Sequence, residues 1–122
     1  MTNRPACLVL VDGYVAGAMI AHEYAYGLHR KLVEMGADDD HTHELVRKSA
    51  AVVLERIPVL TRRLRCLERE WDEQQLLDPS AAERTVKRLE GDVVKLAPEL
   101  AALSDRQKQI VAELLDLVSR AR

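Results

Sequence analysis

Phenylalanine is absent from this chain of 122 residues, and Trp71 and three tyrosines are its only aromatic residues. A hydrophobic core must therefore be built from Leu, Val, Ile, Ala and Met, a set that suits interdigitating helices. Turn-forming residues are also few, with 5 glycines, 4 prolines and Asn only at Asn3. Because β-sandwiches and barrels need such residues between their short strands, these absences exclude an all-β fold.

Cysteine is scarce as well, since Cys7 and Cys66 are the only two and lie far apart. They form neither a CxxC motif nor a pair with metal-ligand spacing. We interpret both as small hydrophobic residues buried in the core of a protein from a reducing compartment.

No hydrophobic run is long enough to predict a membrane span. The apolar stretch over residues 6–20 is interrupted by Asp12 and is shorter than the ~20 residues that a spanning helix needs. It also has only Arg4 ahead of it and lacks the clean cleavage site of a signal peptide. We therefore predict a cytoplasmic protein that does not enter a membrane.

The charge balance and the motifs exclude several functions. A formal net charge of −2 does not draw the whole protein toward nucleic acid or anionic lipid. The chain has no Gly-rich phosphate loop, nucleophile elbow, HExxH or paired-cysteine motif. We therefore predict no enzymatic activity, no catalytic residues and no cofactor.

What the sequence has in abundance is helical periodicity within a single domain. Its 48% hydrophobic residues can bury a core, and no linker, repeat or low-complexity tract divides residues 1–122. A first helix is predicted from about Pro5 to Met35, ending at Gly36. Its beginning is ambiguous, because the short apolar run within residues 6–12 fits a helix or a strand.

A second helix is predicted from the acidic stretch at residues 38–44 to about Leu77, because acidic side chains cap helix starts. Pro58 predicts a kink near residues 55–57, or two abutting helices, because it removes a backbone donor. Apolar residues recur alternately four and three residues apart, as in a heptad seam. These positions are Val46, Ala50, Val53, Ile57, Leu60, Leu64, Leu67 and Trp71.

A tight turn at residues 78–80, followed by a capping box of Ser80 and Glu83, predicts a helical hairpin. The third helix carries the same alternation from Ala82 to Ala121. Gly91, Pro98 and a second capping box at residues 104–107 leave two alternatives, one kinked rod or an additional short helix from Asp105. The predicted fold is an all-α antiparallel bundle of three to five helices around a long hairpin with coiled-coil-like heptad seams.

A helix of about 35 residues is roughly 50 Å long, which exceeds what a compact domain of this size requires. Such a rod exposes more apolar surface than one further helix covers, so we predict a homodimer or another protein partner. The alternative is a compact monomeric bundle. The residues expected to anchor the association are Ile57, Leu60, Leu64, Leu67 and Trp71.

An arginine-rich face raises a second functional hypothesis. Arg62, Arg65 and Arg69 share one side of the predicted second helix, a spacing that can follow a phosphate backbone. The alternative is a solvated face of salt bridges, which flanks coiled coils generally. Because no aromatic residues are interleaved for base stacking, nucleic-acid binding is possible but not favoured.

Histidines raise a third hypothesis, a metal-binding bundle. His22 and His29 are two helical turns and about 10 Å apart, too far for one ion. His41 and Glu44 have usable spacing, but at a helix start such residues more often satisfy backbone groups. We therefore predict no metal site, and expect His22 and His29 to hydrogen-bond across the bundle.

Overall fold

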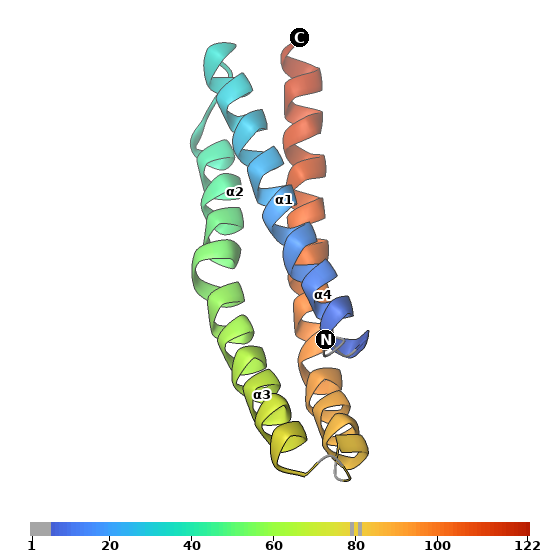
Figure 1. Cartoon of the computed structure of the whole chain (residues 1–122). Coiled ribbons are helices and arrows are strands. Elements are labelled where there is room, and N and C mark those ends of the chain that lie inside the picture. Colours follow the sequence, from blue (N-terminus) through green and yellow to red (C-terminus); the bar gives the residue numbers. More distant parts are fainter. Residues whose placement is uncertain (1–5, 79, 81) are drawn as a thin grey trace.

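The computed structural model describes residues 6–78, 80 and 82–122, and this part of the chain is helical without strands. The elements are α1 (Ala6–Glu34), α2 (Asp40–Ala51), the π-helical segment η1 (Val52–Arg56), α3 (Ile57–Leu77) and α4 (Ala82–Ala121). Since α2, η1 and α3 follow one another without interruption, the described residues form three rods. The rod of α2, η1 and α3 runs antiparallel to α1 and to α4, whereas α1 and α4 run in the same direction (Figure 1). The predicted all-α class is confirmed, and the predicted start at Pro5 lies outside the described residues.

The ambiguous beginning of the first helix is helical. Leu8 and Val11 are buried, while Val9 and Leu10 between them are exposed, a spacing that puts the buried pair on one helical face. The helix ends where Gly36 adopts a φ of +67°, the left-handed conformation that glycine takes without strain. The backbone N–H of Ala37 then donates to Leu32 O at 2.9 Å, which closes the helix.

The acidic stretch begins α2 as predicted. Asp39 is the N-cap, and its Oδ1 accepts hydrogen bonds from the backbone N–H of Thr42 at 2.8 Å and from the Thr42 hydroxyl at 2.9 Å. These bonds stabilise the charged form, so they lower the pKa of the Asp39 carboxyl below its ordinary value. Hydrogen bonds thus fix the connection between α1 and α2 at its beginning, through Ala37, and at its end, through Asp39.

Just before Pro58, where the sequence predicts a kink or two abutting helices, the second rod contains the π-helical turn η1. The N–H of Ile57 donates to Val52 O, five residues back, so this turn holds one residue more than an α-helical turn. Downstream of it, Ile57, Leu60, Leu64 and Trp71 are buried at predicted positions. Upstream the predicted register was wrong by one residue. The buried positions there are Thr42, Leu45, Ser49 and Val52, whereas Val46, Ala50 and Val53 are half-buried.

The third rod, α4, is continuous through Gly91 and Pro98. Pro98 is exposed, so its missing N–H falls on the solvent side of the helix. The predicted capping box at residues 104–107 lies within the helix instead of starting one, because Ser104 and Gln107 are buried against the other two rods. The alternative of an additional helix from Asp105 is therefore wrong.

The core consists of two apolar clusters separated by a polar layer. One cluster joins the beginning of α1 to α3 and the first half of α4, and the other joins the end of α1 to α2 and the end of α4. Between them, Gln107 and Ser49 are buried, and His22 Nδ1 lies 2.8 Å from Ser49 Oγ. This contact agrees with the prediction that His22 hydrogen-bonds across the bundle. Figure 1 shows that the α3–α4 hairpin continues beyond the beginning of α1.

Candidate functional site

The residues predicted to anchor self-association lie inside the protein's own core. Ile57, Leu60, Leu64 and Trp71 are buried, and Leu67 is partly buried against the same cluster. Packing between α3, α4 and the beginning of α1 therefore accounts for their apolar character. Among them, Leu64 also lines the groove between α1 and α3 that is described below.

The exposed surface of α1 carries several apolar residues, together with the charged residues Asp12, Glu23, Arg30, Lys31 and Glu34. Residues on the outer side of this helix are largely exposed, and Ile20 is 66% exposed. Among the described residues, α1 is the one helix long and apolar enough by length and composition to cross a membrane, and only 17% of its apolar window is buried. The sequence-based prediction, which required a longer uninterrupted run, did not identify this helix as a candidate span.

A groove of about 400 Å³ lies between α1 and α3. Apolar side chains from both helices line the groove, namely Val11, Val15 and Met19 of α1 and Leu64 of α3. The charged residues Asp12, Arg65 and Glu68 line it as well. In a three-rod arrangement, a groove of this kind is where a fourth helix packs in a four-helix bundle. The groove is thus an apolar recess with charged groups among its lining residues.

The arginine face is at the surface of α3. Arg62, Arg65 and Arg69 are exposed, and within residues 6–78, 80 and 82–122 none of them forms an ion pair. Neighbouring charges behave as a salt-bridged face, since Arg56 pairs with Glu99 at 2.6 Å and Arg88 with Glu70 at 3.0 Å. In the described part of the chain, the surface of α3 thus has salt bridges at Arg56 and Glu70, and exposed arginines without ion pairs at positions 62, 65 and 69.

The histidine and carboxylate pair considered from sequence is not brought together. His41 Nε2 lies 3.0 Å from Glu113 Oε1 of α4, whereas Glu44 accepts two hydrogen bonds from Arg47, at 2.6 and 2.9 Å. The Arg47 guanidinium lowers the pKa of the Glu44 carboxyl. His41 and Glu44 therefore have different partners.

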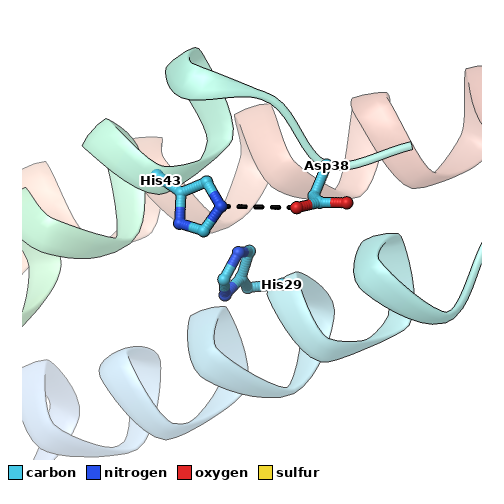
Figure 2. Close-up of side chains that lie close together, drawn as sticks. All are labelled: His29, Asp38 and His43. Carbon is cyan, nitrogen blue, oxygen red and sulfur yellow. Dashed lines mark hydrogen bonds and ion pairs between the residues drawn. The ribbon is translucent and has the colours of Figure 1, made fainter. Parts of the chain in front are cut away.

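A different cluster forms where α1 turns into α2. His29 of α1, Asp38 of the connection and His43 of α2 have donor atoms within 4.8 Å of one another (Figure 2). His43 Nε2 lies 3.3 Å from Asp38 Oδ2, and the His29 and His43 rings meet edge to face with centroids 4.8 Å apart. Spacing rules applied within one helix do not find this cluster, because the reversal at Gly36 brings His29 and His43 together. The acidic, histidine-rich connection was the available signal.

Comparison with protein-family models, with curated proteins and with solved structures finds no match for this chain. Its function must therefore be inferred from its own residues.

Proposed function

We propose that this chain is a small, non-enzymatic helical protein that self-associates, and that a second copy packs along the α1–α3 groove. The observation that carries the proposal is the groove itself, about 400 Å³ in volume, beside a helix with exposed apolar residues such as Met19 and Ile20. Soluble monomers rarely leave a long apolar surface of this kind uncovered. In this proposal the coiled-coil-like seams hold each hairpin together, and α1 supplies the surface between copies.

A homodimer fits the groove because the surface is long and helical on both sides. In a two-fold dimer each copy presents the same patch, so one copy's α1 can lie against the α1–α3 groove of the other. The α1 helix of the second copy then packs beside the three rods of the first copy, as the fourth helix does in a four-helix bundle. The proposed location is the cytoplasm, with membrane binding through α1 as the competing outcome.

The test is the solution mass of the purified chain, measured by light scattering after size exclusion at two concentrations. Met19 lines the groove and is 46% exposed, so Met19→Glu places a charge in the proposed interface with little effect on the core. The control is Leu76→Glu, since Leu76 is 86% exposed near the end of α3. We expect a dimer for the parent and the control, and a monomer for Met19→Glu.

Two outcomes would contradict this proposal. One is a parent chain that stays monomeric at 100 µM, a concentration we choose to be well above micromolar dissociation constants. The other is dimerisation that Met19→Glu leaves unchanged. A parent chain that sediments with neutral lipid vesicles, but does not dimerise without them, would assign the apolar side of α1 to a membrane instead.

The second candidate is binding to the backbone of nucleic acid, favoured by the exposed Arg62, Arg65 and Arg69. It predicts binding of labelled DNA or RNA that weakens steeply with salt and is lost when all three arginines become Glu. Because Arg65 also lines the groove, the dimer is tested with Arg62→Glu and Arg69→Glu alone. Self-association through the groove predicts no effect of this double variant on the dimer, whereas backbone binding predicts weaker binding of nucleic acid, so the double variant distinguishes the two functions.

A further inference from the structure

We infer that His29, Asp38 and His43 form a binding site for one zinc ion, which joins the end of α1 to the beginning of α2. This inference is independent of the self-association proposed above. Two imidazole nitrogens and one carboxylate oxygen are a common zinc donor set, with a fourth position left for water. Calcium and magnesium are poor candidates, because they prefer all-oxygen ligands.

The strongest observation is at His29. Its Nε2 atom is buried and has no hydrogen-bond partner among the described residues. A buried polar atom without a partner costs free energy, so its persistence calls for an explanation. Figure 2 shows the His29 ring projecting from α1 toward His43 and Asp38. Coordination of a metal ion would satisfy this nitrogen.

The other two ligands can adjust to an ion. The side chains of His43 and Asp38 are 59% and 33% exposed, so their rotation is not blocked by a packed core. Zinc bound at about 2.0–2.1 Å holds neighbouring ligand atoms about 3.3–3.4 Å apart in tetrahedral geometry. The donor atoms here lie within 4.8 Å, and the closest pair is already at 3.3 Å. Small side-chain rotations therefore suffice.

The backbone that carries the ligands is fixed before any ion arrives. Gly36 ends α1 in the left-handed conformation, and Asp39 caps α2 through Thr42. Asp38 lies between these two anchors, so ordering the loop costs little when the ion binds. Such preorganisation favours binding at this connection.

The experiment is a zinc titration of the untagged protein after treatment with a chelator, followed by competition with a zinc-sensitive dye. We expect one zinc ion per chain and a higher thermal midpoint in its presence. His43→Gln removes an exposed ligand and should weaken zinc affinity by about tenfold or more. His41→Gln is the matched control, because His41 is exposed on the same helix but contacts Glu113 instead.

Asp38→Asn provides a second variant, with Asp40→Asn as its control, and circular dichroism confirms that each variant is folded. Zinc affinity that is equal in the parent, His43→Gln and Asp38→Asn would overturn the inference. So would equal losses for His41→Gln and His43→Gln, because they would indicate adventitious binding to surface histidines. Calcium or magnesium that competes with zinc at equal concentration would rule out the proposed donor chemistry.

Discussion

The side-chain amide of Gln107, buried in α4, donates a hydrogen bond to the backbone carbonyl of Ser49 in α2 at 3.2 Å. The same amide donates to Ala18 O of α1 at 3.3 Å, so one residue connects all three rods. Its carbonyl oxygen Oε1 is buried and without a partner in the described structure. The polar layer between the two apolar clusters is therefore only partly satisfied.

Substitution of Gln107 should separate the effect of its size from that of its polarity. Gln107→Leu removes two hydrogen bonds but also the unpaired Oε1, so we expect a change within about 1 kcal/mol. Gln107→Glu places a carboxylate beside two carbonyl oxygens and should cost about 3 kcal/mol or more at neutral pH. Urea unfolding followed by circular dichroism measures both. A larger loss for Leu than for Glu would contradict this account.

The π-helical turn predicts that one residue can be deleted without loss of fold. Leu54 is 73% exposed within η1, and its deletion would place the buried Val52 and Ile57 four residues apart, as in a regular α-helix. Combined with Pro58→Ala, which restores the missing N–H, the deletion should keep stability within about 1 kcal/mol. Thermal melts of the variant provide the measurement.

The control for this deletion is removal of Arg63, an exposed residue of α3 outside the π turn. Its loss rotates Leu64 and Trp71 relative to the rest of the rod, so most of the helical signal should be lost below the parent's melting temperature. If both deletions are equally harmful, the additional residue of η1 is required for folding, and the interpretation of η1 as an insertion fails.

Trp71 should stabilise the folded protein through the volume that its side chain fills, and not through a hydrogen bond of its indole N–H. The side chain is buried between α3 and α4, and Nε1 has no hydrogen-bond partner among the described residues. Trp71→Ala should therefore destabilise the protein by about 3–5 kcal/mol. Trp71→Phe keeps an aromatic ring and should cost less than about 1.5 kcal/mol. Chemical denaturation gives both values, and equal losses would indicate an essential N–H bond.

The two thiols should differ in reactivity. Burial, which disfavours the thiolate, raises the pKa of Cys7, whereas Cys66 is exposed on α3. At pH 7.5 a smaller fraction of Cys7 is ionised than for a free thiol, so Cys66 should react several times faster with a thiol reagent. The single-cysteine variants Cys7→Ala and Cys66→Ala measure each rate. Faster reaction at Cys7 would show that its end of α1 opens.

Periodicity within the chain was sufficient to predict the helical class, the hairpin and most buried positions of α4. Ile57, Leu60, Leu64 and Trp71 are buried at the predicted seam positions, but they lie in the protein's own core, whereas they were expected to anchor association with a partner. The separate expectation that Cys66 is buried is wrong, because Cys66 is exposed. The register upstream of η1 was wrong because heptad spacing assumes uniform turns, and one π turn shifts every preceding residue. Pro58 indicated that the helix is irregular near residues 55–57, but it did not indicate that the irregularity is a π-helical turn.

The histidine cluster was not predictable by the same means. His29 and His43 belong to different helices, and their approach depends on the reversal at Gly36 and the cap at Asp39. Spacing within a sequence reports neighbours along one helix only. The groove between α1 and α3 was missed for a similar reason, because it depends on how far the two helices diverge.

The α3–α4 hairpin extends past the beginning of α1, so among the described residues its far end consists of α3 and α4 alone (Figure 1). Amide hydrogens at residues 70–77 and 82–88 should therefore exchange with solvent sooner than those of the three-rod region. We therefore expect unfolding to begin at this end of the hairpin and to proceed toward the polar layer. The protein's lifetime against proteases would be set at this end, far from the histidine cluster.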